Sequence, residues 1–458
     1  MLILAFTTIA TCVGIRLETH NDWYFIIMVL TLVAAVTLKA PNWFKAVLGG
    51  FILLVGMFIF GFANSFYFEL AIQIAIYSAM ALGLNIVVGQ AGLLDLGYAA
   101  FFAIGAYTWA IFGSAQANQF IAGGGFPLNG VWIYAFFFIA IITTAITGLL
   151  IGLPALRLRG DYLAVVTLGL GEVVRVVANN LNKPVNITNG ALGITPVTRP
   201  PLGWFSDMLS GFGVPEQLHY QIFFYLLVLI IIALIVVVNI NLNNSRYGRA
   251  WVAIREDEIA AKAMGVPMLQ TKLIAFMTGA AFSGAMGVIF ASQRTFVSPE
   301  SFTLLASVVI MSYVVMGGMG SIQGVILGTT TLIILNLDIL KNISGQLNTW
   351  RQEGLVISPL FTIVVAVLIL LGLWLLRMPI YAKIAIGILA GLILFRLTGY
   401  NLATLPSQLE PTKYERLIFG IILVLMMIFR PQGLIPEQRH QIEDQEARLE
   451  ASSKGGKA

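Results

Sequence analysis

The run YQIFFYLLVLIIIALIVVVNI (residues 220–240) holds no charged residue and is long enough to cross a hydrocarbon core of roughly 30 Å. Backbone groups in lipid must bond within their own segment, so this run predicts a transmembrane α-helix. Comparable apolar runs recur along the chain and predict an all-α, polytopic bundle of about 12–14 helices. They lie near residues 2–15, 23–38, 46–62, 70–88, 93–112, 131–153, 162–178, 272–292, 302–316, 323–340, 355–376, 380–397 and 417–429.

The composition agrees with lipid as the main solvent of the chain. Apolar residues make up 59% and charged residues 10%, with a mean hydropathy of +0.90, whereas soluble domains have about 25% charged residues. The single Cys12 excludes a disulfide within the chain, and the three histidines lack metal-ligand spacing, so no metal is expected. The first apolar run lacks a basic flank and is interpreted as a retained helix rather than a signal peptide.

Basic residues concentrate on alternate connections between the apolar runs. The connections near 63–67 and 113–130 carry no Lys or Arg. The positive-inside rule therefore places the basic connections, and both termini, in the cytoplasm. The pattern is not clean, because Arg16, Arg294, Lys341 and Arg351 would fall outside. The cytoplasmic set comprises Lys39, Lys45, Arg157, Arg159, Arg246, Arg249, Arg255, Lys262, Arg377, Lys383, Arg430, Arg439 and Arg448.

One cytoplasmic connection, residues 241–271, contains the run REDEIAAKAMGVP (residues 255–267). Acids at its start and Gly265 followed by Pro267 at its end predict a short, capped helix. It is too short to span the membrane and too polar to lie in lipid. It is either an interfacial helix against headgroups or a docking element for a partner. The candidate partner residues are Glu256, Asp257, Glu258, Ala260, Ala261, Met264 and Gly265, with Ala260, Ala261 and Met264 expected to be exposed.

The run from Ile259 to Gly265 resembles the Glu-Ala-Ala-x-x-x-Gly loop of ABC importer permeases, although Ile259 stands in place of the Glu. Six further stretches resemble LivM-type branched-chain amino acid permeases, and they follow one another in the expected order. They are GLNIVVGQAGLLDLGY (83–98), LRLRGDY (156–162), GLGEVVR (169–175), FVSPESF (296–302), GGMGS (317–321) and FRPQGL (429–434).

The resemblance implies a permease subunit of an ABC importer for branched-chain or neutral amino acids in a bacterial inner membrane. No Gly-x4-Gly-Lys-Ser/Thr phosphate loop occurs, so the chain is expected to be non-catalytic and to bind no cofactor. The implied partners are two cytoplasmic ATPase subunits that use ATP and Mg²⁺, a periplasmic substrate-binding protein and a second, homologous permease forming a heterodimer. Nucleic acid is not expected as a partner.

The apolar runs, the resemblance and the polar, charged composition of the last residues together suggest a division of the chain. N-terminal helices would occupy residues 1–66 and the permease core 67–345. An inserted helix pair would occupy 346–400, a C-terminal core helix 401–436, and a disordered cytoplasmic tail 437–458.

Candidate residues of the translocation path are polar or glycine residues within apolar runs: Asn85, Gly89, Gln90, Asp95, Thr167 and Glu172. Gly is abundant, with 45 residues, which favours close helix packing. The run from Gly89 to Gly92 is the best candidate for a broken helix facing the path. Asp95 is expected to cap a helix near the cytoplasmic surface or to meet a substrate ammonium. Glu172 and Arg175 are expected to pair on one helical face.

Three alternatives remain at this point. A permease for urea or short amides would share the architecture. An ion-coupled secondary transporter would need more intramembrane acids than Asp95, Glu172 and Asp338. A non-transporting membrane anchor would not need glycine-broken helices.

Overall fold

The computed structural model describes residues 2–17, 24–25, 27–28, 31, 42–121, 123–156, 161–352, 411–429 and 432–435. Within these ranges the ordered elements are helices, and one isolated bridge joins Ile194 and Val297. The all-α prediction is therefore confirmed. The chain forms two compact units, Met1–Ile333 with Leu423–Ala458, and Ile334–Ile422.

In the described ranges, six helical stretches are long and apolar enough to cross a membrane. Shorter apolar helices run over Val47–Ala63, Ala99–Ala110, Leu304–Gly317 and Leu417–Ile428. The polytopic prediction is thus confirmed. Most of the predicted run 23–38, the inserted pair within 346–400 and the tail 437–458 lie outside the described residues. The long stretches are Phe66–Gln90, Gly130–Ala155, Tyr162–Asn180, Glu216–Asn243, Met268–Arg294 and Ile322–Thr349.

The helices of the larger unit follow the apolar runs closely. Before its core come α1 (Leu2–Leu17), α3 (Asn42–Phe51) and α4 (Met57–Ala63). The core helices are α5 (Phe66–Asn85), α6 (Ala99–Ala110), α7 (Ile133–Ala155), α8 (Asp161–Asn180), α10 (Glu216–Asn243), α13 (Met268–Arg294), α14 (Leu304–Gly317) and α15 (Ile322–Ile334).

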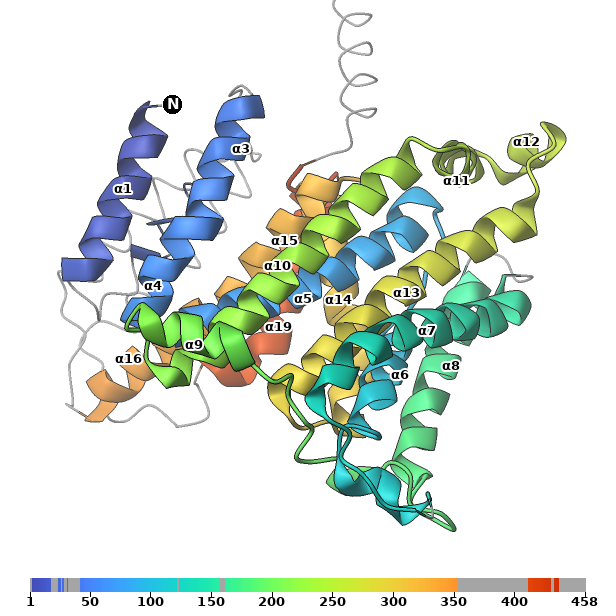
Figure 1. Cartoon of the computed structure of the whole chain (residues 1–458). Coiled ribbons are helices and arrows are strands. Elements are labelled where there is room, and N and C mark those ends of the chain that lie inside the picture. Colours follow the sequence, from blue (N-terminus) through green and yellow to red (C-terminus); the bar gives the residue numbers. More distant parts are fainter. Residues whose placement is uncertain are drawn as a thin grey trace, which may run out of the picture. The chain divides into compact units, whose positions relative to one another are not determined.

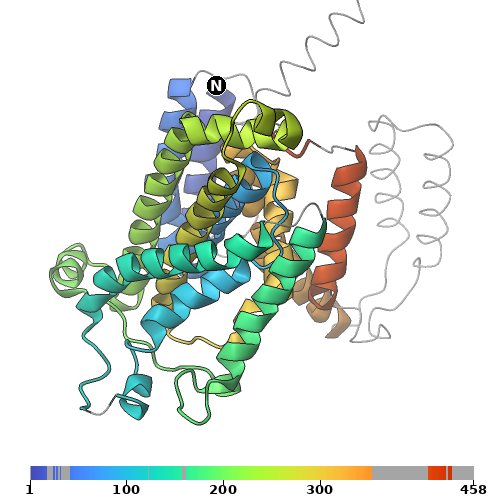
Figure 2. The same ribbon diagram turned by 90° about the vertical axis from the view of Figure 1, so that its right-hand side faces the viewer.

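Helix α13 is the centre of the larger unit. It packs most extensively against α7, α6 and α5, which Figures 1 and 2 show running beside it. Close approach depends on glycine: a Cβ atom at Gly105 of α6 would lie 2.2 Å from the carbonyl oxygen of Gly284 in α13. The expectation that glycines serve helix packing is confirmed at this contact.

Outward faces of the same bundle remain apolar. On α7, Phe138, Ile142 and Leu150 are more than half exposed, and on α10 so are Ile230 and Leu234. These residues recur at intervals of four and eight, so each set lies along one face of its helix. Such apolar stripes suit contact with lipid or with another apolar helix.

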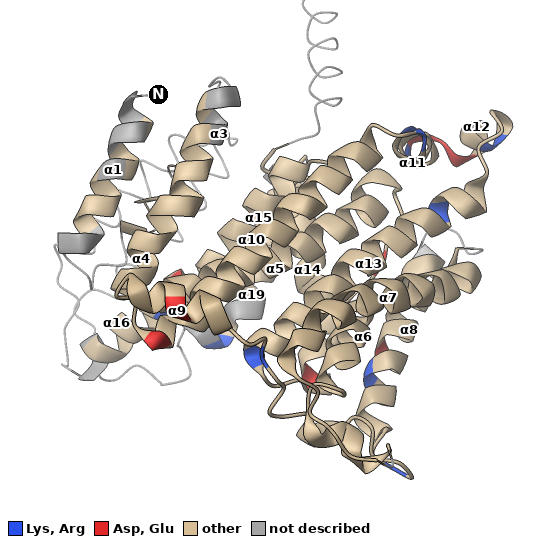
Figure 3. Ribbon diagram, in the orientation of Figure 1, with Lys and Arg blue, Asp and Glu red and all other residues tan. Residues whose placement is uncertain are grey.

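Two short helices follow α10: α11 (Arg246–Glu256) and α12 (Glu258–Ala263). They contact the last residues of α10, the first of α13 and the segment that ends α5. We call this side of the larger unit the α11–α12 end. Charged residues gather around α11 and α12 (Figure 3). The sequence predicted α12 but treated the residues of α11 as loop.

The opposite ends of α5, α10 and α13 form what we call the α9 end. It is named after α9 (Gly203–Gly211), which contacts α10. The Ser206 Oγ of α9 lies 2.8 Å from Nδ1 of His219 in the first turns of α10. The long connection between α8 and α10 therefore contains one regular α-helix.

The smaller unit begins with the π-helix η7 (Leu335–Leu340) and α16 (Lys341–Gln352). It also contains η10 (Pro411–Tyr414) and the start of α19 (Glu415–Phe429). Asp338 is buried, and its Oδ1 accepts a hydrogen bond of 3.0 Å from Nδ2 of Asn342.

Candidate functional site

Helix α5 ends in a break. Its last turn widens into the π-helix η2 (Ile86–Gln90), and Ala91 to Tyr98 are not helical before α6 begins at Ala99. Gly92 has a φ of +67°, a conformation that side-chain-bearing residues rarely adopt. The predicted break at Gly89–Gly92 is therefore confirmed. The predicted continuous run 93–112 is wrong in its first part, because side chains replace the helical hydrogen bonds there.

Asp95 and Thr167 supply those replacing bonds. The Oδ1 atom of Asp95 accepts the N–H of Gly97 at 2.9 Å, and the Oγ1 atom of Thr167 accepts the N–H of Leu96 at 3.1 Å. The expectation that Asp95 caps a helix near the surface is wrong. Asp95 is 1% exposed, and α6 begins four residues later. Its Oδ2 atom has no hydrogen-bond partner among the described residues.

A cluster of buried amides lies beside the break. The Oδ1 atom of Asn85 accepts the N–H of Gly320 at 2.8 Å. Nε2 of Gln90 donates to Oδ1 of Asn239 at 3.3 Å, and Nδ2 of Asn239 donates to the carbonyl of Leu82 at 3.2 Å. Within the described residues, Nδ2 of Asn85 and Oε1 of Gln90 remain without a partner. Unsatisfied buried amides are uncommon and favour a functional interpretation.

Gly89 lets this cluster form. A Cβ atom there would lie 2.1 Å from Oδ1 of Asn85 and 2.5 Å from the backbone nitrogen of Gly320. Sequence reasoning found Asn85 and Gln90 but missed Asn239. Its signal was an isolated amide in the run VVVNI at the end of α10.

Helix α11 reaches into the break. The guanidinium of Arg255 donates from Nη1 to the carbonyl oxygen of Gly89, and its Nη2 lies 3.3 Å from Glu256. Its stem covers Gly92, where a Cβ atom would lie 2.9 Å from Cγ of Arg255. Arg255 was predicted as a cytoplasmic basic residue, and its contact with the core was missed.

Helix α12 is capped as the sequence predicted. Oδ1 of Asp257 accepts the N–H groups of Ile259 and Ala260 at 2.8 and 3.0 Å, and Gly265 ends the turn with a φ of +84°. Ala260 is exposed, and Met264 is 85% exposed. Ala261 corrects the prediction, because it is only 4% exposed on the packed side of the short helix.

One exposed residue and one ion pair further define the surface of α12. Ile259, which the sequence reading treated only as a departure from a motif, is 78% exposed. Oε1 of Glu258 accepts a hydrogen bond of 2.8 Å from Nζ of Lys272, a side chain of α13 that is 7% exposed. Glu258 and Arg255 thus attach α12 and α11 to two different core helices, α13 and α5. Glu256 remains exposed.

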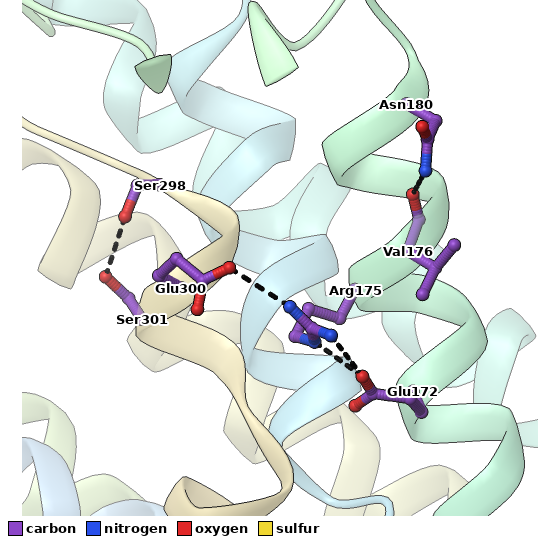
Figure 4. Close-up of polar contacts among 7 residues, drawn as sticks. All are labelled: Glu172, Arg175, Val176, Asn180, Ser298, Glu300 and Ser301. Atoms are coloured by element: carbon purple, nitrogen blue, oxygen red, sulfur yellow. Dashed lines mark hydrogen bonds and ion pairs between the residues drawn. The ribbon is translucent and has the colours of Figure 1, made fainter. Parts of the chain in front are cut away.

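Glu172 lies away from the amides, farther along α8. It pairs with Arg175, as predicted, and Nη1 of Arg175 also lies 3.1 Å from Oε1 of Glu300 in η6 (Pro299–Phe302) (Figure 4). The structure therefore brings Asn85, Gly89 and Gln90 together, and places Asp95 on the adjoining loop, which Thr167 of α8 contacts. Glu172 instead joins α8 to η6.

Known proteins resemble this chain along most of its length. Residues 66–373 match the family described as the permease component of branched-chain amino acid transport systems. The high-affinity branched-chain amino acid transport system permease protein LivM of Salmonella typhimurium is 39% identical over 63% of this chain and 69% of the relative. LivM of Escherichia coli is 38% identical over the same shares.

Two other relatives are more distant or shorter in overlap. A probable branched-chain amino acid transport permease protein LivM of Methanocaldococcus jannaschii is 24% identical over 83% of this chain and 88% of the relative. The L-arabinose transport system permease protein AraH of Escherichia coli is 33% identical over 29% of this chain and 38% of the relative. No solved structure matches the chain significantly.

The amide cluster predicts a stability difference between two buried polar residues. Replacing Asn85 by Leu leaves the N–H of Gly320 without its acceptor, so the unfolding free energy should fall by about 1–3 kcal/mol. Ser78→Ala is the matched control, because its buried hydroxyl has no partner among the described residues. Thermal unfolding in detergent measures both. Equal melting temperatures for the two variants would contradict a structural role for the Asn85 bond.

Proposed function

This chain belongs to the family of permease components of branched-chain amino acid transport systems, and from that premise we propose that it forms part of the membrane path of an importer for branched-chain or neutral amino acids. It is a multi-pass membrane protein and a permease subunit. The substrate class rests on the names of the relatives, three of which are branched-chain amino acid permeases.

The observation that carries the proposal is the exposed α12 anchored to the core. Ile259 and Met264 protrude from it, while Glu258 and the neighbouring Arg255 connect it to α13 and to the end of α5. A lone interfacial helix would not need ion-pair and hydrogen-bond anchors to two core helices. We propose that α12 docks on a separate ATPase subunit, which hydrolyses ATP with Mg²⁺. Motion of that subunit then reaches the break in α5.

This docking sets the orientation of the chain. The α11–α12 end holds Arg246, Arg249, Arg255 and Lys262, so the positive-inside rule places it in the cytoplasm. The α9 end then faces the periplasm across the bacterial inner membrane. Both termini are proposed to be cytoplasmic. A periplasmic binding protein would deliver substrate at the α9 end, beside a second, homologous permease subunit.

The break in α5 is the proposed path element. Non-helical backbone at membrane depth is stable where it is buried in protein or lines a polar cavity. The candidate residues are Asn85, Gly89, Gln90, Asp95 and Thr167, with Glu172 farther along α8. Two acceptors unpartnered among the described residues, Oε1 of Gln90 and Oδ2 of Asp95, are free to bind water or a passing ammonium, and the unpartnered donor Nδ2 of Asn85 is free to bind water or a carboxylate.

The docking surface can be tested by placing a carboxylate on α12. Ile259→Asp and Met264→Asp would each bury a charge against the ATPase. Stimulation of ATP hydrolysis by the substrate-loaded binding protein should fall at least about tenfold, the equivalent of about 1.4 kcal/mol of lost docking. The measurement uses the complete complex in proteoliposomes.

Leu192→Asp is the matched control for these two variants. Leu192 is 77% exposed at the α9 end, so its replacement should leave the ATPase subunit bound to the permease, which co-purification of the two subunits measures independently of the binding protein for all three variants. Wild-type stimulation in both the Ile259 and the Met264 variants would refute the docking role of α12.

The Asp95 carboxylate can be tested without disturbing its loop. In Asp95→Asn the amide oxygen still accepts the N–H of Gly97, so the protein should fold and insert normally. Hydrogen bonds to a charged group contribute about 1.5–3 kcal/mol, so uptake of leucine should fall about tenfold or more. Uptake at the wild-type rate, with equal protein in the membrane, would show that the charge has no part in transport.

A further inference from the structure

A cavity of about 420 Å³ lies at the α9 end of the larger unit, among the first turns of α5 and α10 and the last turn of α13. Small-molecule sites commonly measure about 300–1,000 Å³. The break in α5 lies at the other end of that helix, so this cavity is separate from the amide cluster. None of the predicted path residues lines it.

Charges of both signs line the cavity. Arg294 at the end of α13 forms an ion pair of 2.9 Å with Glu69 in the first turn of α5. Arg199 is held in place, because its Nη2 donates to the carbonyl of Gln293 at 3.2 Å and its guanidinium lies 5.0 Å from the ring centroid of Tyr220. Glu216, the first residue of α10, adds a second carboxylate.

Two acceptors in the same wall lack donors. Oε1 of Gln221 and Oε1 of Gln293 are buried and have no hydrogen-bond partner among the described residues. Buried acceptors are normally paired, and leaving one unpaired costs about 1–3 kcal/mol. An ammonium group carries three donors and no acceptor, so it fits a wall of carboxylates and amide oxygens.

The guanidinium groups and the apolar residues of the lining suit the carboxylate and the side chain of an amino acid. Guanidinium groups bind carboxylates through paired N–H donors. The cavity therefore offers cationic donors, anionic acceptors and apolar surface from Ile72 and Phe224 within one space. We propose that it binds an α-amino acid with an apolar side chain, its carboxylate on Arg294 or Arg199 and its ammonium near Glu216 and the Gln221 and Gln293 oxygens. The proposal rests on the import function above and adds an entry site to it.

Binding there would also act on α5. A ligand carboxylate at Arg294 competes with Glu69 for the same guanidinium, so it weakens the ion pair that ties the first turn of α5 to α13. The other end of α5 is the break that Arg255 contacts. One helix thus joins the entry site to the ATPase-docking helices.

The test measures binding of radiolabelled leucine to the complete complex in nanodiscs, with the binding protein omitted. Saturable binding is expected. Excess unlabelled leucine should displace the label. Leucinamide, which lacks the carboxylate, and 4-methylpentanoate, which lacks the ammonium, should not.

Two variants separate binding from folding. Gln221→Met removes an unpartnered buried oxygen, so a merely structural role predicts equal or higher thermal stability, whereas the proposal predicts about tenfold weaker leucine binding. Arg294→Gln should weaken binding by a similar factor. Gln119→Met and Lys183→Gln are matched controls, since both residues are exposed outside the cavity, and should bind leucine like the wild type.

The outcomes also separate this proposal from the import function. Binding-protein-dependent leucine uptake by the wild-type complex is measured in parallel. If uptake occurs but the complex shows no saturable leucine binding, or the Gln221 and Arg294 variants bind like the wild type, the entry site is wrong and the import function stands. If Arg294→Gln instead weakens only the affinity of the binding protein, the surface is a protein-docking site and the proposal is overturned. Failure of uptake in the wild type would contradict the import function itself.

Discussion

The carbonyl groups released where α5 stops are the constraint on which the rest of the arrangement depends. A helix that ends inside a membrane bundle leaves backbone acceptors in a medium that cannot hydrate them. Here the donor for the Gly89 carbonyl comes from Arg255, at the end of a surface helix. Because this buried carbonyl needs a donor, the end of α5 is connected to α11, the helix that precedes the proposed ATPase-docking helix α12.

The same requirement explains the polar residues around the break. Asp95 and Thr167 accept backbone N–H groups of the segment that follows α5, and Asn85 accepts the N–H of Gly320 between α14 and α15. For Asn85 and Asp95, the second side-chain polar atom has no partner among the described residues. Structural and transport roles are therefore not alternatives at these residues, because one atom of Asn85 or Asp95 holds the backbone while the other faces no donor or acceptor of the described chain.

Local signals in the sequence were enough to predict the break in α5 and the caps of α12. Glycines predicted the break, because φ values such as that of Gly92 are rare for other residues. An acid, a short helical run and Gly265 predicted the caps of α12. The sequence did not predict the core contacts of Arg255, Asn239 and Lys272, because these contacts depend on tertiary packing. Arg255 and Gly89 are 166 positions apart, and Gln90 and Asn239 are 149 apart. Ala261 and Asp95 were misjudged for the same reason, since burial depends on packing that periodicity does not show.

The claim that the break in α5 is linked to the ATPase through Arg255 is tested most directly by the ratio of leucine transported to ATP hydrolysed. The ratio is measured in proteoliposomes for Arg255→Leu. Arg249→Leu serves as the control on the same helix, because Arg249 donates to the Asn244 carbonyl within its own loop. The account predicts continued ATP hydrolysis with a markedly lower ratio for the Arg255 variant. An unchanged ratio would contradict it.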